Sequence, residues 1–321
     1  MGRADLTIPW MSEPAGQQRK SVLEVLGAAV LFGTTGTTAS FAPLAASSVS
    51  IGAARLVIGG AGLIAALPLL GGSRRSAVSL WRNRWGLTAG IMTALYQLAF
   101  FAGVSRAGVA LATLVTIGSG PIFVGLLSWL FLRERPTGSW WFSTALCITG
   151  LVLLTLEGSG HPGVEAGGFL LALVSGFGYA VYTVAAKRLM TRGVHAPEVM
   201  ASAFTLGGLL LLPVLLASGA AWIASPQGLA VALWLGLATT TVAYFLFGRG
   251  LRVLSAGPTA TLVLAEPLVA TILGVFLLGE HLDLAGWAGA AIVAAGLGLQ
   301  GLSSIRSRPG DESNVIEASL A

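Results

Sequence analysis

Long runs of apolar residues, separated by short polar segments, cover most of the chain. A helix of roughly 20 apolar residues crosses a bilayer core about 30 Å thick. Ten runs approach or exceed that length, at residues 22–42, 50–70, 86–104, 107–132, 138–156, 166–187, 198–217, 228–248, 256–279 and 285–303. The segments between them are too short for a soluble domain. The pattern therefore predicts an all-α integral membrane protein with ten transmembrane helices.

Polar residues occupy both ends of the chain. Residues 1–20 and 304–321 are predicted to be tails outside the membrane. Residues 44–47, Leu-Ala-Ala-Ser, could mimic a signal-peptidase site. Cleavage there would remove the first apolar run and destroy the repeat described below, so we favour an intact first helix.

The composition agrees with a membrane protein. Hydrophobic residues make up 55% of the chain and charged residues only 10%, with a mean hydropathy of +0.84, whereas soluble domains carry about 25% charged residues. This balance excludes an ordinary soluble enzyme, a disordered regulator and a nucleic-acid-binding protein. The single cysteine excludes an internal disulfide.

The basic residues predict the orientation. If the N-terminus is cytoplasmic, 16 of the 18 Lys and Arg residues fall in the tails or in the loops on that side. The exceptions are Arg106, in an outer loop, and Arg55, inside the second run. Such a bias follows the positive-inside rule. We therefore expect a multi-pass protein of a bacterial-type cytoplasmic (inner) membrane, with both termini cytoplasmic.

The two halves of the chain repeat each other. Pro121 and Pro267, Glu134 and Glu280, Trp141 and Trp287, and Gly150 and Gly296 are each 146 residues apart, and Trp85 and Trp234, Ala107 and Ala256, and Gly108 and Gly257 are each 149 apart. Residues 21–156 and 165–303 are thus predicted to be two repeats of five helices each. Because five is odd, the second repeat must insert upside down relative to the first.

Inverted repeats build transporters whose halves exchange roles, so that a central site opens to each side of the membrane in turn. A receptor, an anchor or an enzyme does not need that symmetry. The alternative is that duplication was only a route to a larger stable bundle.

Three motifs occur in the predicted helices of the two halves. They are Ala260-x6-Pro267-x12-Glu280, its twin Pro121-x12-Glu134, and residues 168–175 followed by Tyr179-Ala180-Val181-Tyr182-Thr183. Together they resemble the EamA family of the drug/metabolite transporter superfamily. The resemblance spans about residues 22–302. It implies a bundle around a central cavity lined by helices 1, 3, 4, 6, 8 and 9, and secondary transport of small metabolites. The chain lacks the Gly-x4-Gly-Lys-Ser/Thr phosphate loop of ATP-driven proteins.

Glu266 is the sharpest candidate for a functional residue. It lies in the middle of the ninth run, where an ionised carboxylate is costly unless it faces a cavity or a partner. It could exchange a proton or capture a substrate ammonium group, or it could be a hydrogen-bonded acid that locks helices together. Arg55 could bind a substrate carboxylate or pair with Glu266, or it could extend outward to the membrane surface as an anchor.

Polar side chains within the expected lining helices are further cavity candidates. They are Thr34 and Thr35 in the first run, Tyr96 and Gln97 in the third, Tyr179 and Tyr182 in the sixth, and Tyr244 in the eighth. The glycines around Thr34 and Thr35 could allow close helix packing or local unwinding. Plain core packing is the alternative for the tyrosines.

Two symmetric pairs are candidates for moving parts. Pro121 and Pro267 each remove a backbone hydrogen bond and are predicted hinges, with a static kink as the alternative. Glu134 and Glu280 end the fourth and ninth runs, where each could clamp an arginine or a helix N-terminus as a gate.

The leading interpretation is an exporter of small metabolites, such as amino acids or toxic compounds, that works by alternating access. An importer or exchanger of the same fold is the alternative. No catalytic residues, metal site or cofactor are predicted, because His161, His195 and His281 are far apart and show no metal-ligand spacing. A membrane-embedded enzyme or a sensor without transport are further alternatives. The expected partners are the substrate, the bilayer and protons as coupling ion, while the sequence leaves the oligomeric state open.

Overall fold

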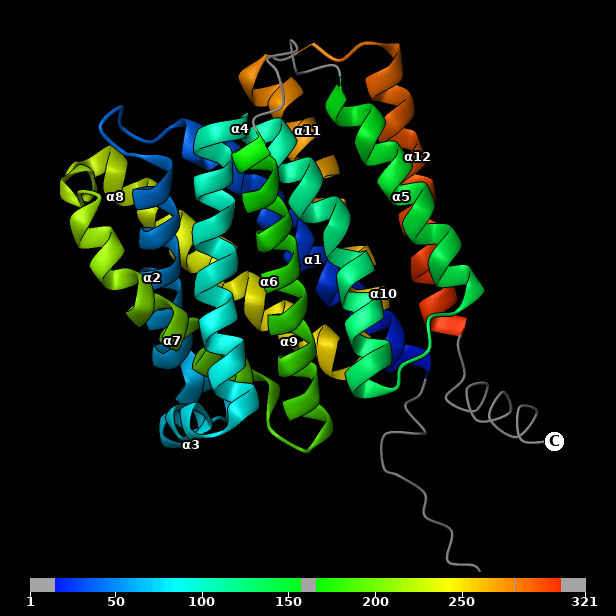
Figure 1. Cartoon of the computed structure of the whole chain (residues 1–321), viewed down its shortest axis with the longest axis horizontal. Helices are drawn as coiled ribbons and strands as arrows, with labels where there is room; N and C mark the ends of the chain where they lie inside the picture. The colour runs from blue at the N-terminus through cyan, green and yellow to red at the C-terminus, as the bar shows by residue number, and fades with distance from the viewer. Residues whose placement is uncertain (1–14, 157–165, 280, 307–321) are drawn as a thin grey trace, which may run out of the picture.

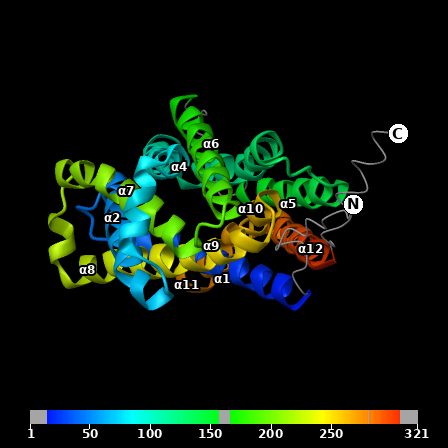
Figure 2. The same cartoon turned by 90° about the horizontal axis from the view of Figure 1, so that it is seen from below.

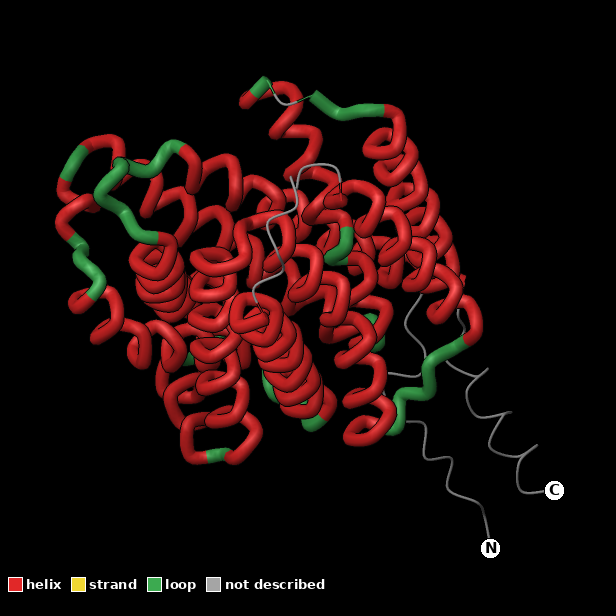
Figure 3. Tube along the Cα trace, turned by 45° about the horizontal axis from the view of Figure 1, so that its top comes forward, coloured by secondary structure: helices red, strands yellow, loops and turns green. Residues whose placement is uncertain are grey.

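A computed structural model describes residues 15–156, 166–279 and 281–306. Helices and their connecting turns make up this described part of the chain, and no strand occurs within it (Figures 1 and 3). The all-α prediction is therefore confirmed.

The helices follow the apolar runs closely. Their bounds are α1 Ala15–Ser40, α2 Ser48–Ala66, α3 Arg74–Ser79, α4 Arg84–Leu132, α5 Gly138–Leu156, α6 Ala166–Thr191, α7 Ala196–Ala217, α8 Pro226–Leu233, α9 Ala243–Val253, α10 Ala256–Leu262, α11 Ala265–Leu278 and α12 Leu284–Arg306. Short 3₁₀ turns occupy Leu67–Leu70, Leu80–Arg82 and Ala221–Ala224, and a π-helix, η4, spans Trp234–Val242 between α8 and α9.

Side-chain caps mark where several helices begin. Ser47 accepts a hydrogen bond from the Ser50 backbone N–H at the start of α2, and Asn83 accepts one from Trp85 at the start of α4. These side chains satisfy backbone donors that the first helical turn leaves without partners. The short polar segments of the sequence are thus the capping segments of the fold.

Eight helical segments of the described residues are long and apolar enough to cross a membrane, and Gly138–Leu154 is a shorter apolar helix. One of the eight is α4, whose 49 residues would extend about 73 Å at 1.5 Å per residue. That is more than twice the thickness of a bilayer core.

The backbone of α4 is broken near its middle. Gly108 has φ 80° and ψ 163°, a conformation that glycine adopts far more readily than other residues. Figure 1 shows the two halves of α4 running in opposite directions. The break falls at the second residue of the fourth predicted run, next to its boundary with the third, so α4 contains both runs.

Two further helical segments are irregular. The π-helix η4 interrupts the segment from α8 to α9. A tighter turn separates α10 from α11, where the backbone N–H groups of Leu264 and Glu266 each donate to the carbonyl three residues earlier. Irregular turns within helices often occur at functional sites. The hydrophobic pattern had predicted one uninterrupted helix in each place.

The helices pack in pairs. α4 packs on α6, α5 on α12, and α2 on α7, while α1 packs on both α9 and α11 (Figures 1 and 2). Glycines permit the closest approach between α5 and α12: a Cβ added to Gly150 would lie 2.7 Å from the carbonyl oxygen of Gly289. Small residues at such contacts let membrane helices approach closely.

The described chain begins and ends at the same end of the bundle. The start of α1 and the end of α12 both lie at the bottom of Figure 1, the end at which α3 also lies. Arg74 in α3 and Arg188 near the end of α6 belong to the basic segments predicted to be cytoplasmic.

Candidate functional site

All four tyrosines of the chain meet in one buried cluster. Tyr96 of α4, Tyr179 and Tyr182 of α6, and Tyr244 of α9 have ring centroids 5.9–6.3 Å apart wherever their rings are in contact. The hydroxyl oxygens of Tyr96 and Tyr244 are 2.5 Å apart and share a hydrogen bond. The structure therefore brings together every tyrosine that the sequence nominated for the cavity.

Phenylalanines that the sequence analysis missed complete the tyrosine cluster. Phe32 of α1 lies 4.8 Å from the Tyr244 ring, and Phe204 of α7 lies 3.9 Å from it, measured between centroids. Phe247 of α9 is 6.4 Å from Tyr182. Hydropathy does not distinguish these phenylalanines from others in the core, so only packing could identify them.

Three polar atoms near the tyrosine cluster are buried without a well-aligned hydrogen bond to any described residue. They are the Tyr179 hydroxyl, the Thr183 hydroxyl one turn later on α6, and Gln97 Nε2. The Tyr179 and Thr183 side chains are close enough to interact with each other. Buried polar groups are usually paired, and each unpaired group has an energetic cost. A polar ligand at this place would give these atoms better-aligned hydrogen bonds. The sequence could have indicated Thr183, because it is a polar residue four positions after Tyr179 in an apolar run.

Glu266 lies in the first turn of α11, directly after the tight turn that separates this helix from α10. Its side chain is half-buried, and no hydrogen bond or ion pair joins it to another described residue. Gly33 of α1 lies so close that an added Cβ would be 2.8 Å from the Glu266 carbonyl oxygen.

Arg55 points into the bundle. Its side chain is 8% exposed, and it donates from Nε to the Thr240 hydroxyl and from Nη2 to the Thr239 carbonyl, both at 3.1 Å. The two acceptors belong to the π-helix η4. The charge of Arg55 acts on Glu266, Tyr96 and Tyr244. This position does not agree with the alternative of an outward-extending anchor, and it links the irregular turn to the cluster.

Thr34 and Thr35 lie on an unbroken stretch of α1, so local unwinding is not seen there. Thr34 donates to the Leu31 carbonyl and accepts from Trp234 Nε1 at 3.0 Å. The buried hydroxyl of Thr35 has no partner among the described residues. Of the two, Thr35 is therefore the one with a free polar atom.

The two prolines lie in different surroundings. Pro267 is the third residue of α11 and follows the helix break, whereas Pro121 lies inside the second half of α4, away from the break at Gly108. Gly120, next to Pro121, faces the ring of Tyr179. Both prolines therefore lie near residues of the candidate site.

Glu134 contacts a helix N-terminus at one end of the bundle. Its Oε2 accepts a hydrogen bond from the Ala256 backbone N–H at the start of α10, at 2.8 Å. Nearby, the buried Lys187 donates from Nζ to the carbonyls of Leu251 and Leu254, each at 2.8 Å. The sequence analysis had counted Lys187 only as a loop charge. Glu280 lies outside the described residues.

The described residues contain no group of three or more His, Cys, Asp or Glu side chains arranged to hold a metal ion. The candidate site consists instead of aromatic rings, hydroxyl groups, one amide, one carboxylate and one guanidinium. Such a set can hold a small organic molecule by stacking, hydrogen bonding and charge.

The fold and this site define a multi-pass helical membrane protein with a polar cluster inside its bundle. The model of the EamA-like transporter family matches residues 19–156 and again residues 166–301. The chain belongs to the EamA-like transporter family.

Relatives and a solved structure agree with this assignment. The uncharacterized transporter YwfM of Bacillus subtilis is 40% identical over 276 residues, 86% of this chain and 91% of that protein. The threonine/homoserine exporter RhtA of Escherichia coli is 31% identical over 219 residues, 67% of this chain and 68% of that protein. A solved crystal structure superposes with a TM-score of 0.75 at 23% identity, covering 89% of this chain and 98% of its own, and so shows the same fold.

Proposed function

We propose that this protein is a secondary active exporter of small metabolites with an ammonium group, such as amino acids or toxic cations, and that it works by alternating access. The observation that carries the proposal is the cluster of four tyrosines together with a half-buried Glu266 at the turn between α10 and α11. The exporter RhtA among the relatives supports the direction of transport.

An inverted repeat of two five-helix units is part of the proposal. The 146-residue offset relates Gly150 to Gly296 and Ser143 to Gly289. An added Cβ at Gly150 would lie 2.7 Å from the Gly289 carbonyl oxygen, and one at Gly296 would lie 3.1 Å from the Ser143 carbonyl oxygen. Replacing each residue of the first contact by its equivalent in the other repeat gives the second contact. A two-fold axis between α5 and α12 requires this relation. The two matches to the family model give independent support.

The other helix pairs fit the same relation. Helices 3 and 4 of the first unit, the two halves of α4, pack on α6, which begins the second unit. In the second unit α9 and α11 pack in turn on α1, which begins the first. In such a bundle the two units can rock about the central cluster, with Pro121 and Pro267 as hinges.

The aromatic rings and the carboxylate suit a cation. An ammonium group is attracted to the faces of tyrosine rings and, more strongly, to a carboxylate in a site that excludes water. Glu266 would bind this ammonium group and, after its release, take up a proton instead. The carboxylate would then always be either paired with the ammonium group or protonated within the bundle. The hydroxyls of Tyr179 and Thr183 would accept hydrogen bonds from the rest of the substrate or donate hydrogen bonds to it.

The test is efflux from cells loaded with a panel of amino acids, including threonine and homoserine. We expect expression of the wild type to accelerate efflux of at least one of them and Glu266→Gln to abolish it. Glu198→Gln is the matched control: Glu198 accepts a hydrogen bond from Ser73 away from the cluster, and glutamine can still accept it. Undiminished, proton-dependent efflux by Glu266→Gln would remove Glu266 from the mechanism.

Direction needs a separate measurement. Vesicles of known orientation with an imposed proton gradient would distinguish export from import or exchange. We expect substrate to move toward the face opposite the chain termini. Movement only toward the termini would favour the importer alternative.

A further inference from the structure

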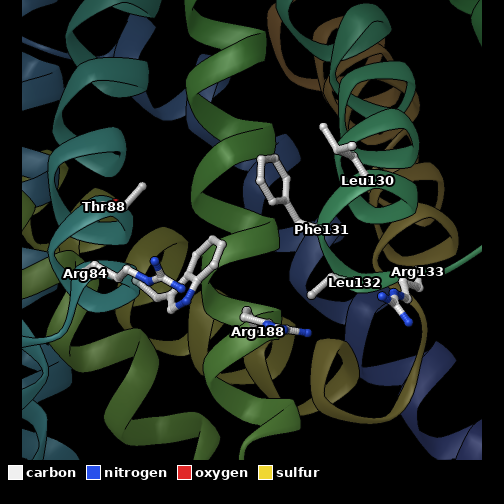
Figure 4. A pocket seen from close by; sticks show the side chains of 8 residues that line it. Arg84, Thr88, Leu130, Phe131, Leu132, Arg133 and Arg188 are labelled. Atoms are coloured by element: carbon white, nitrogen blue, oxygen red, sulfur yellow. The ribbon is translucent and has the colours of Figure 1, made fainter.

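A second group of polar side chains lies toward one end of the bundle, where α4 begins and ends and α6 approaches its end. A cavity of about 740 Å³ opens there. Figure 4 shows Arg84 at the start of α4, Arg133 just beyond its end, and Arg188 on α6 between them. The third and fourth predicted helices therefore meet α6 around one basic cavity.

The charges of this cavity are unbalanced. Arginine side chains stay protonated in proteins, and no hydrogen bond or ion pair joins any of the three to another described residue. Arg84 lies over the ring of Trp85 at 5.4 Å. The neighbouring acid in the sequence, Glu134, is not among the residues that line the cavity, and its Oε2 accepts a hydrogen bond from the Ala256 backbone N–H. Three like charges around one cavity repel one another, and a bound anion relieves that repulsion.

Two buried donors of the lining residues also lack acceptors. Arg188 Nε and Trp85 Nε1 have no hydrogen-bond partner among the described residues. A buried donor without an acceptor is unfavourable by roughly 1–3 kcal/mol. A group with several anionic oxygens satisfies both the donors and the charges, and arginine forks match phosphate geometry particularly well.

One side of the cavity is apolar and open. Leu130 and Phe131, in the last turn of α4, are 70% and 46% exposed. In a membrane these side chains face lipid chains, while the arginines lie at the level of the headgroups. Basic pockets between transmembrane helices recognise anionic lipid headgroups in this way.

We propose that this cavity is a phosphate-binding site and that its occupant is the phosphate of an anionic phospholipid headgroup. Arg84, Arg133 and Arg188 hold the phosphate oxygens, Trp85 donates a further hydrogen bond, and Leu130 and Phe131 contact the acyl chains. Free inorganic phosphate shares the headgroup chemistry but not the apolar contacts. The site is independent of the transport proposed above and is tested without it.

Binding to the purified full-length protein in detergent tests the proposal. Native mass spectrometry would follow titration with phosphatidylglycerol, phosphatidylcholine and inorganic phosphate. We expect phosphatidylglycerol to bind at least tenfold more tightly than phosphatidylcholine. Arg188→Gln should weaken the binding of phosphatidylglycerol about tenfold, because a charged hydrogen bond is lost. Arg192→Gln is the matched control, since Arg192 is exposed at the same end of α6 and does not line the cavity.

A second variant keeps the test valid if Arg188→Gln fails to fold. The double variant Arg84→Gln/Arg133→Gln alters two exposed side chains. It should weaken the binding of phosphatidylglycerol at least as much as Arg188→Gln does. Equal binding of phosphatidylglycerol by the wild type and by both variants, or equal binding of the two lipids by the wild type, would overturn the proposal. Arginine-dependent binding of inorganic phosphate as tight as that of phosphatidylglycerol would keep the phosphate site and reject the lipid as its source.

Discussion

Tyr96 and Tyr244 are 148 residues apart in the chain, yet their hydroxyl oxygens share a hydrogen bond at 2.5 Å. At the scale of single residues, the sequence nominated both as polar groups in apolar helices but left open whether they pack or line a cavity. For Arg55, too, the sequence indicated part of the answer and the structure supplied the rest. Its place in an apolar run indicated a special role, while its partners Thr239 and Thr240 depend on a π-helix that no local pattern revealed.

Removing one hydroxyl of the tyrosine pair tests the cluster. In Tyr244→Phe the ring keeps its contacts with Phe32 and Phe204, so we expect the protein to fold with a loss of about 1 kcal/mol in stability from the missing hydrogen bond. Transport should fall about tenfold if the hydroxyl pair orients the substrate.

The measurement for Tyr244→Phe is the melting temperature in detergent together with efflux. Tyr182→Phe is a control for stability, because the Tyr182 hydroxyl donates only a weak 3.9 Å bond to the Met200 sulfur. Wild-type efflux by Tyr244→Phe would argue that the pair is packing alone.

At the scale of elements, hydrophobic length predicted where helices lie but not how they are interrupted. The reversal at Gly108 lies next to the predicted boundary between the third and fourth helices, whereas neither the π-helix η4 nor the turn at residues 263–264 was predicted. Both unpredicted interruptions occur within sequences of high hydropathy. Their cause is backbone conformation and packing, which an average over apolar residues does not register.

Close packing between α1 and α11 should depend on Gly33. In Gly33→Ala the added Cβ would lie 2.6 Å from Val269 Cβ and 2.8 Å from the Glu266 carbonyl oxygen. Overpacking of this kind costs about 1–3 kcal/mol, so we expect a lower melting temperature. Gly36→Ala on the same helix is the control, because nothing lies within 4 Å of its added Cβ. An equal effect of both changes would contradict the packing role.

An ion pair joins α1 to α9 at the end of the bundle where α1 begins. Arg249 Nη2 lies 2.8 Å from Glu24 Oε1. We expect Glu24→Gln to shift the protein toward a state open at that end, by less than tenfold because such partly exposed pairs are worth up to about 1 kcal/mol. A cysteine placed at the neighbouring Val253 should then react faster with a polar thiol reagent.

The charge-reversed double variant Glu24→Arg/Arg249→Glu is the control for this pair. It restores an attractive pair and should return the labelling rate toward that of the wild type. If Glu24→Gln leaves the rate unchanged, the pair does not hold that end closed.

At the scale of the whole molecule, the basic residues predict which face of the membrane each loop reaches. The described chain begins and ends at one end of the bundle, in agreement with an even number of crossings. The native Cys147 is buried, so single cysteines introduced elsewhere can report on access without a background signal.

We expect a cysteine in place of Ala45, in the exposed loop between α1 and α2, to react with an impermeant reagent in intact cells. Cysteines in place of Ser73, just before α3, and Ser313, in the C-terminal tail, should react only after the membrane is opened. The two-fold inverted arrangement would be contradicted if Ser313 and Ser73 reported opposite faces.

The sequence alone determined the membrane location, the helical class and the approximate extent of nearly every helix. These properties are local, since each segment in a bilayer must satisfy its own backbone hydrogen bonds and present apolar side chains to lipid. Tertiary structure decided which faces meet. It placed Arg55 against η4, gathered four tyrosines from three helices and left three arginines around one cavity, because such contacts join residues far apart in the chain and depend on how closely neighbouring helices can approach.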